Sequence, residues 1–261
     1  MKQRQTNVTG AQPLDLAGQD ERAQAAAVRE MFTSIAPRYD FLNHFLSLRV
    51  DTLWWQRTAR TFTHILRAGK ARVLDLCCGT GDMSFALLRE SRRGNSGSAS
   101  VVGVDFSHAM LVRALSKTNE ASDVRAMAWI EADALSLPFG PSTFQLVTSA
   151  FGFRNLVNYD AGLREIYRVL APGGEVGILD FGEPDGMIGQ LYRLYFRYGL
   201  PAIGSVLSGV RGPYAYLPAS VHRFPRPEQM LERLRSAGFR EASWTPYTFG
   251  IAGLYRGIRP E

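Results

Sequence analysis

The chain has 261 residues and a net charge of +6, and its 46% hydrophobic and 21% charged residues are typical of a soluble globular domain with a sizeable core. No apolar run is long enough to span a bilayer, and the first residues lack the apolar centre of a secretory signal, so we expect a cytoplasmic protein. The arginines are dispersed, so we expect no nucleic-acid partner; peripheral contact with an anionic membrane surface and a homodimer are left open.

Two helices are expected before the first strand. Residues 1–22 are polar and without periodicity, which indicates a flexible tail ahead of a single domain over residues 23–261. Apolar residues then recur at helical spacing until Pro37 ends the pattern. Asp51 is placed to cap a second helix that ends at Gly69. These helices are expected to cover the domain at its N-terminal side.

From there on, short β-rich runs alternate with helical segments. This alternation predicts an α/β fold whose parallel sheet is covered by helices on both faces. The last two runs are joined by a tight connection and predict an antiparallel hairpin at the sheet edge. The seven predicted strands are 71–76, 100–106, 127–132, 143–151, 174–181, 241–249 and 251–257.

A long aromatic-rich segment separates the fifth strand from the next helix. At residues 186–227 it is too long for a plain strand-to-helix loop, which predicts a helical insertion. Two interpretations stay open and are compatible: packing against the domain, or a lid over a large apolar ligand or a membrane-facing surface.

The stretch "VLDLCCGTGDM" contains the only two cysteines of the chain, Cys77 and Cys78. Adjacent cysteines rarely form a disulfide because of ring strain. Metal sites usually need wider cysteine spacing and further ligands, so we expect no metal. The cysteines are interpreted as small side chains in a tight turn.

The same stretch has the order strand, acid, small residues, helix, which is typical of a nucleotide-type site. Gly79 and Gly81 would let a ligand approach the backbone closely. Asp75 at the strand end and Asp82 at the helix start would repel a phosphate. They would suit a cation, such as the amino group of an amino-acid moiety.

Acids also end the next two strands. Asp105 is placed to accept hydrogen bonds from both hydroxyls of a ribose. Asp133 is placed to accept from an adenine amino group, with the backbone amide of Ala134 beside it. A ligand that has a ribose, an adenine and an ammonium group but no phosphate is S-adenosylmethionine.

Over about residues 28–257 the chain resembles the ubiquinone/menaquinone biosynthesis C-methyltransferase family. The resemblance implies a class I S-adenosylmethionine-dependent methyltransferase with a Rossmann-like sheet, acting on polyprenylated quinols. The motifs that carry it are "APRYDFLNHFLSLRVDTLW", "DLCCGTGD", "FGFRN", "RVLAPGGEVGILDFGEP", "YAYLPASVHRFP" and "GIAGLYRG". The departures from the family pattern are Leu42, Asp51, Ala171, Asp180, Gly182 and Ala219.

The resemblance also implies contacts with the cofactor. It implies that Thr80 contacts the cofactor, together with Asp105, Asp133 and Ala134. The family often has a serine just before "FG", where this chain has Ala150 with Ser149 next to it. Ala150 can therefore contribute only its backbone.

C-methylation needs electron density on the quinol ring, and ionising a phenol with a pKa of about 10 would supply it. Arg154 is too basic to act as a base, but it can stabilise a phenolate or orient a water, with Asn155 fixing its geometry. Tyr39 is a candidate to bind a substrate oxygen, and His222 to act as a base.

The resemblance favours a polyprenylated demethylnaphthoquinol as the substrate, converted from demethylmenaquinol to menaquinol. A methoxy-polyprenyl-benzoquinol of ubiquinone biosynthesis is the alternative within the family. A methyltransferase of unrelated substrate or a dinucleotide oxidoreductase fits the motifs less well. Outside the enzymes, the chain would be a cofactor-binding assembly component of a quinone-synthesis complex.

Overall fold

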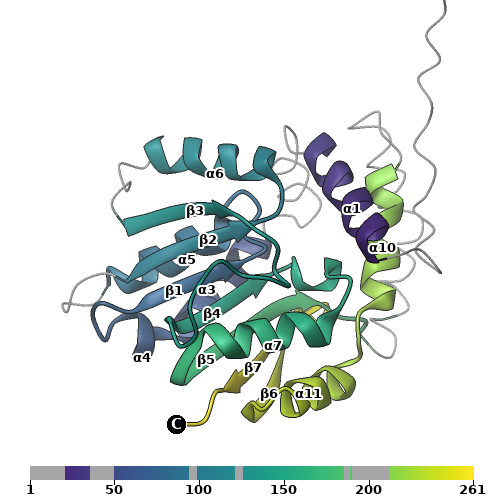
Figure 1. The fold of residues 1–261 in the computed structure, drawn as a ribbon. Coiled ribbons are helices and arrows are strands. Elements are labelled where there is room, and N and C mark those ends of the chain that lie inside the picture. The colour runs from purple at the N-terminus through teal and green to yellow at the C-terminus, as the bar shows by residue number, and fades with distance from the viewer. Residues whose placement is uncertain (1–20, 36–49, 94–98, 121–125, 185–188, 190–211) are drawn as a thin grey trace, which may run out of the picture.

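The computed structural model describes residues 21–35, 50–93, 99–120, 126–184, 189 and 212–261 (Figure 1). The strands are β1 (Arg72–Leu76), β2 (Ser100–Asp105), β3 (Met127–Glu131), β4 (Phe144–Ala150), β5 (Leu170–Phe181), β6 (Arg240–Tyr247) and β7 (Ala252–Ile258). The helices are α1 (Glu21–Ile35), α3 (Val50–Thr61), α4 (Thr63–Leu66), α5 (Asp82–Ser91), α6 (His108–Glu120), α7 (Tyr159–Val169), α10 (Gly212–Arg223) and α11 (Pro227–Ser236). Two 3₁₀ turns, η3 (Phe153–Asn155) and η5 (Thr248–Gly250), follow strand ends.

The strands form one seven-stranded sheet in the order β3-β2-β1-β4-β5-β7-β6. The pairs from β3 to β5 are parallel, and β7 runs antiparallel to both of its neighbours. The seven strands and the terminal hairpin predicted from the sequence are confirmed. Because the parallel strands share one direction, their carboxyl ends meet at one edge of the sheet, where ligands of open α/β sheets bind.

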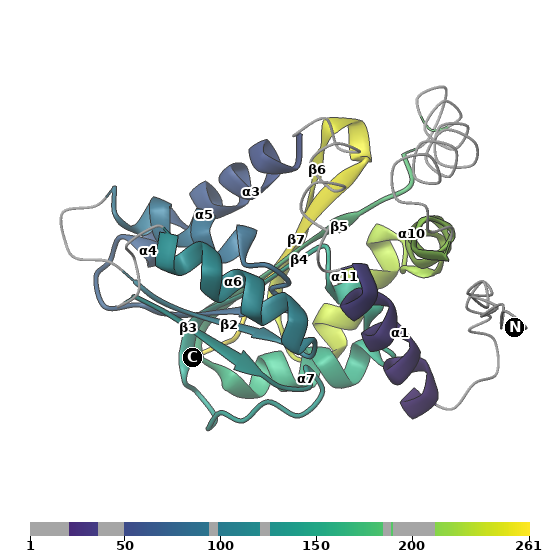
Figure 2. The same cartoon turned by 90° about the horizontal axis from the view of Figure 1, so that it is seen from above.

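Helices cover both faces of the sheet, as expected (Figures 1 and 2). One core joins the sheet to α7 and α11 through side chains such as Ile166 and Leu234. The other joins it to α3, α4 and α5 through side chains such as Phe62 and Leu87. Burial of these apolar side chains on both faces explains why the parallel strands read as nearly continuous apolar runs.

Two element boundaries differ from the sequence prediction. The helix expected to run to Gly69 is split at Phe62 into α3 and α4, and Asp51 lies inside the first turn of α3 instead of capping it. Phe62 is fully buried, so its packing takes precedence over helix continuity. The fifth strand begins at Leu170, directly after α7, because Leu170 already pairs with Phe144 on β4.

Helices α1 and α10 lie side by side over the carboxyl edge of the sheet (Figures 1 and 2). The rings of Phe32 on α1 and Tyr216 on α10 meet edge to face, with centroids 6.5 Å apart. The expected N-terminal cover is thus present as α1, and α10 is the described part of the predicted insertion at 186–227. The predicted tail lies almost wholly outside the described residues. Among those described, no helix is long and apolar enough to cross a bilayer.

Candidate active site

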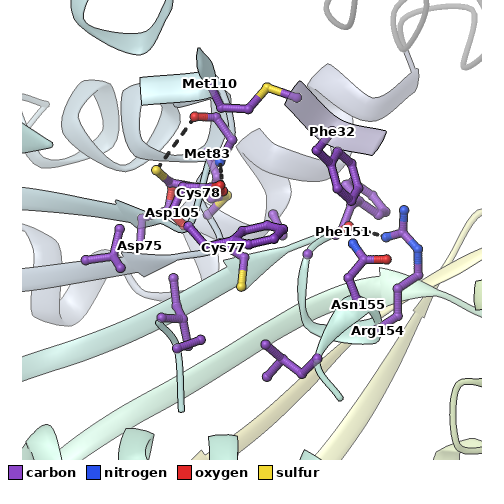
Figure 3. Close-up of a pocket in the computed structure, with 18 of the residues that line it drawn as sticks. Phe32, Asp75, Cys77, Cys78, Met83, Asp105, Met110, Phe151, Arg154 and Asn155 are labelled. Atoms are coloured by element: carbon purple, nitrogen blue, oxygen red, sulfur yellow. Dashed lines mark hydrogen bonds between the residues drawn. The ribbon is translucent and has the colours of Figure 1, made fainter. Parts of the chain in front are cut away.

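A cavity of about 610 Å³ lies at the carboxyl edge of the sheet, which is large enough for a cofactor with part of a second ligand. Its walls come from α1, α3, η3, η5, the starts of α5 and α6, the loops after β1 to β4, and the end of β5. The close-up shows two sides: Asp75, Asp105 and the cysteines on one, and Phe32, Phe151 and Arg154 on the other (Figure 3). The first side holds the residues predicted to bind a cofactor.

The glycine loop turns sharply after β1. Cys77, Gly79 and Gly81 all have positive φ, at 54°, 55° and 88°. A Cβ on Gly81 would come within 2.4 Å of the Trp129 ring, so only glycine fits. Both cysteines are reduced and act as small packing groups: a Cβ on Gly152 would come 2.4 Å from the Cβ of Cys77. Gly79 lines the cavity, where its bare backbone leaves room for a ligand, whereas Gly81, also predicted to contact the cofactor, does not line it and packs against Trp129 instead.

Asp105 at the end of β2 holds this loop in place. Its Oδ2 accepts from the amide of Gly79 at 2.8 Å, and its Oδ1 accepts from the amide of Ser107 at 2.9 Å. Burial raises its pKa to about 6. Each carboxylate oxygen can accept a further hydrogen bond, so both remain suited to the ribose hydroxyls.

Asp133 follows β3 and also lines the cavity. Its Oδ1 accepts from the amide of Leu135 at 2.9 Å, which closes a turn and fixes the carboxylate. Ala134, buried beside it, lines the same wall. The turn-forming and ligand-binding interpretations of Asp133 are therefore compatible.

Asp75 is fully buried beneath the loop. Its oxygens accept from Ser84 at 2.5 Å and from Thr148 at 3.0 Å. Burial raises its pKa to about 7, although both hydroxyls oppose this shift. Asp75 lines the cavity, so an ammonium group placed there would favour its ionised form.

Asp82 has a different role from the one expected. Lys117 of α6 lies 3.0 Å from Asp82 Oδ1 and donates to Thr80 Oγ1 at 2.9 Å. The charge of Asp82 is thus balanced within the chain; Asp82 also lines the cavity, and its contact with a ligand ammonium stays a prediction. Thr80 itself lines the cavity, as the resemblance implied.

On the other side of the cavity, Arg154 is held by a buried carboxylate. Its guanidinium lies 2.9 Å from Asp180 Oδ1, and its amide donates to Asp180 Oδ2 at 3.0 Å. Arg154 also donates to Ser220 Oγ on α10 and to the carbonyl of Phe151. Burial raises the pKa of Asp180, while the guanidinium opposes the shift. This arrangement fixes a cation at the wall of the cavity.

Sequence reasoning missed Asp180 as the partner of Arg154. The signal was present, because Asp180 ends β5 as Asp75 and Asp105 end β1 and β2. That Asn155 fixes Arg154 stays a prediction; Asn155 Oδ1 accepts from the Tyr216 hydroxyl at 2.9 Å. Asn155 lines the cavity and is itself positioned by α10.

An aromatic wall, defined as Trp54, Phe151 and Phe181, flanks Arg154. The rings of Phe151 and Phe181 are 4.5 Å apart, and Trp54 lies 5.7 Å from Phe151 and 6.1 Å from Phe181. The Arg154 guanidinium lies 5.2 Å from the centre of Phe181. Rings and a cation at this place suit a flat aromatic ligand with an oxygen that carries negative charge.

Two other predicted site residues, His222 and Ser149, do not line this cavity. His222 lies on α10 with its side chain 84% exposed and pairs with Glu183 at 3.0 Å; its role as a base stays a prediction. Ser149 is buried on the opposite face of β4 from Ala150, and of the two only Ala150 lines the cavity. Tyr39 lies outside the described residues.

The first side of the cavity fits S-adenosylmethionine. It offers carboxylates at or just after the ends of β1, β2 and β3, and the backbone of Gly79, which has no side chain to fill the cavity. These groups match an ammonium, two ribose hydroxyls and an adenine amino group. The sheet order and this site define the class I S-adenosylmethionine-dependent methyltransferases.

Solved structures share this fold at low sequence identity. The superposition with the [4+2]-cyclase SpnF covers 90% of this chain and 97% of SpnF, with a TM-score of 0.65 and 18% sequence identity. An S-adenosyl-L-methionine-dependent methyltransferase from Methanococcus maripaludis gives a TM-score of 0.60 at 16% identity, over 88% of this chain and 94% of its own. These likenesses show the fold.

Sequence comparisons show the family. The profile of the ubiE/COQ5 methyltransferase family matches residues 19–259, and the chain belongs to this family. "Demethylmenaquinone methyltransferase" of Thermus thermophilus is 44% identical over 88% of this chain and 100% of its own length. The protein of the same name from Deinococcus radiodurans is 42% identical, over 91% and 95%. A "Ubiquinone/menaquinone biosynthesis C-methyltransferase" of Geobacter sulfurreducens is 39% identical, over 88% and 87%.

Proposed function

We propose that this enzyme methylates a ring carbon of a polyprenylated demethylnaphthoquinol, converting demethylmenaquinol to menaquinol. The observation that carries the proposal is the position of Arg154 and the aromatic wall opposite the cofactor side of one cavity. Relatives named for demethylmenaquinone at 42% and 44% identity support this substrate.

S-adenosylmethionine supplies an electrophilic methyl group on a sulfonium. Asp105, Asp133 and the loop after β1 would hold it, with Asp75 beside its ammonium. The aromatic wall would stack on the quinol ring and align a ring carbon with the methyl group. As the new carbon–carbon bond forms, the bond between sulfur and methyl would break and leave S-adenosylhomocysteine, and the ring carbon would then lose its proton to water. Because the wall is apolar, it would also exclude water from the reacting atoms.

Arg154 would stabilise the phenolate form of the quinol. A nearby guanidinium lowers the pKa of a phenol, and the ionised oxygen raises electron density at the ring carbon that forms the new bond. The ion pair with Asp180 keeps the guanidinium in place without substrate. Asn155 would contact a second substrate oxygen through its amide group.

The deciding experiment is a methyl-transfer assay with labelled S-adenosylmethionine. Reduced demethylnaphthoquinol and reduced methoxy-benzoquinol, each with a short prenyl tail, are offered in parallel. We expect label in the naphthoquinol. Label in the benzoquinol alone would overturn the choice of substrate, and label in both would indicate one enzyme for two pathways.

Two variants separate the role of Arg154 from that of the fold. Arg154→Gln is expected to lower kcat by about 100-fold or more, since it removes a charged group that acts in the transition state. Cofactor affinity should stay within about twofold. Arg164→Gln on the exposed side of α7 is the matched control and should leave turnover unchanged. Unaltered turnover in Arg154→Gln would refute the phenolate role.

An assembly protein without turnover is the competing function from another class. The intact loop and the preorganised Arg154 speak against it, since neither is needed for a purely structural role. Cofactor binding without methyl transfer to any quinol would favour it.

We place the enzyme in the cytoplasm, in peripheral contact with the inner face of the membrane, because a polyprenyl tail partitions into lipid. A homodimer is a further proposal, which sedimentation analysis would test.

A further inference from the structure

The surface where α3 meets η5 carries two exposed apolar side chains. Leu53 on α3 is 63% exposed, and Phe249 in η5 is 76% exposed. Trp54 Nε1 donates to Thr248 Oγ1 at 2.8 Å, so the residues next to Leu53 and Phe249 are in direct contact. The two exposed side chains therefore flank one junction.

The backbone at η5 is strained. Thr248, Phe249 and Gly250 follow one another with φ of 45°, 58° and 90°. Residues with a Cβ disfavour this region, and a β-branched residue such as threonine disfavours it most. Such conformations persist where the surroundings hold them, and they cluster at functional sites. In η5 one of the strained residues, Phe249, also exposes its aromatic ring to solvent.

The junction is also a wall of the cavity. Trp54, Thr248 and Ile251 line it from the inside, at the end that holds the aromatic wall. Leu53 and Phe249 do not line it, although each is one residue away from a lining residue. The exposed apolar side chains thus lie just outside the apolar end of the cavity.

Arginines continue this surface along α3. Leu53, Arg57 and Arg60 are exposed and spaced four and three residues apart, which places them on one helix face. The Arg57 guanidinium lies 4.2 Å from the centre of the Tyr247 ring, next to η5. Apolar side chains bordered by arginines are typical of surfaces that lie at a lipid interface, with the cations at anionic headgroups.

We propose that Leu53, Arg57, Arg60 and Phe249 dock the enzyme on an anionic lipid bilayer, with the apolar end of the cavity toward the lipid. The inference rests on the proposed polyprenylated substrate. Docking here would let the quinol ring enter the cavity while most of its tail stays in the bilayer. The strained turn would then serve to hold Phe249 outward for insertion.

The test is cosedimentation of the full chain with phosphatidylcholine vesicles, with and without phosphatidylglycerol. Leu53→Ser with Phe249→Ser is expected to weaken partitioning about tenfold or more, since two apolar side chains no longer insert. Val112→Ser with Leu115→Ser on α6 is the matched control, since these side chains are 49% and 48% exposed. It should bind like wild type. Arg57→Gln with Arg60→Gln should lose only the preference for anionic vesicles.

Equal loss in the α6 control, unaltered binding of the Leu53/Phe249 variant, or a wild-type chain that binds no vesicles would overturn the docking surface. Capture of a protein through these residues without lipid binding would assign the surface to that protein. Turnover of a short-tailed, water-soluble quinol separates the two proposals. It should persist in the Leu53/Phe249 variant; its absence in wild type that still docks on vesicles would refute the proposed function alone.

Discussion

Three buried acids lie at the carboxyl ends of the parallel strands β1, β2 and β5, and their different partners give them different roles. Asp75 is bonded to two hydroxyls, Asp105 to two backbone amides, and Asp180 to a guanidinium and two amides. Burial raises the pKa of Asp75 and Asp105 although these hydroxyls and amides oppose the shift, so an added cation or donor would favour their ionised forms. Asp180 has its cation within the chain.

Cofactor affinity should therefore rise with pH. Asp75 and Asp105 titrate near 7 and 6, and only their carboxylate forms attract an ammonium or accept both ribose hydrogen bonds fully. We expect the Kd for S-adenosylmethionine to fall between pH 5.5 and 8 in calorimetric titrations. Asp75→Asn should remove the part of the rise near pH 7 and keep the part near 6. A flat profile for wild type would contradict this assignment.

Asp180→Asn tests the positioning of Arg154. Removing one partner of a buried ion pair is expected to destabilise the fold by about 3–5 kcal/mol and to lower kcat, because the guanidinium loses its anchor. Cofactor Kd should be little altered. Glu90→Gln is the matched control: Glu90 is buried and paired with Arg67 and Arg93 away from the cavity. It should lower stability but not kcat, as measured by thermal unfolding and turnover.

At the scale of elements, the turn between β1 and α5 brings the backbone of Gly81 into close contact with the Trp129 ring. Gly81 precedes α5 in a left-handed conformation, with the Trp129 ring against its α-carbon. Gly173 has a comparable φ of 72° but no atom within 4 Å of an added Cβ. A side chain at Gly173 would therefore meet backbone strain alone, whereas a side chain at Gly81 would meet backbone strain and a steric clash with Trp129.

Gly173→Ala should cost about 1–2 kcal/mol of stability, the cost of a left-handed conformation for a residue with a Cβ. Gly81→Ala should cost more, because the Cβ also displaces Trp129, and it should weaken cofactor binding. Chemical denaturation and calorimetry measure both. Equal losses would mean that Trp129 moves aside freely.

The sequence predicted the helices and strands well where the spacing of apolar residues along the chain determines the type of element. Strand existence, the glycine loop and the acids at strand ends follow from alternation and from the shared edge of parallel strands. Contacts between distant elements could not be predicted that way. Lys117 reaching Asp82, or Tyr216 reaching Asn155, depends on how α6 and α10 pack. The position of His222 could not be predicted for the same reason, because it depends on how α10 packs.

At the scale of the whole molecule, a ligand in the cavity between the carboxyl ends of the strands and helix α1 should stabilise the fold. Saturation to about 100 times Kd adds about 2.7 kcal/mol, which for a chain of this size raises Tm by about 5–10 °C. We expect this shift with S-adenosylmethionine in differential scanning fluorimetry. Asp105→Asn should reduce it, whereas Glu90→Gln should lower the starting Tm and keep the shift. No shift in wild type would argue against the assigned cofactor side.

The place of β7 has a consequence for how the chain is made. β7 comes after β5 and β6 along the sequence, yet it lies between them, and among the described strands it is the only one that pairs with β6. During synthesis, β5 and β6 each have an unpaired edge until residues 252–258 emerge from the ribosome. Open edges of this kind pair with other chains. A break in translation between Ile251 and β7 would therefore yield an aggregation-prone product, even though the described residues that line the cavity had already been made.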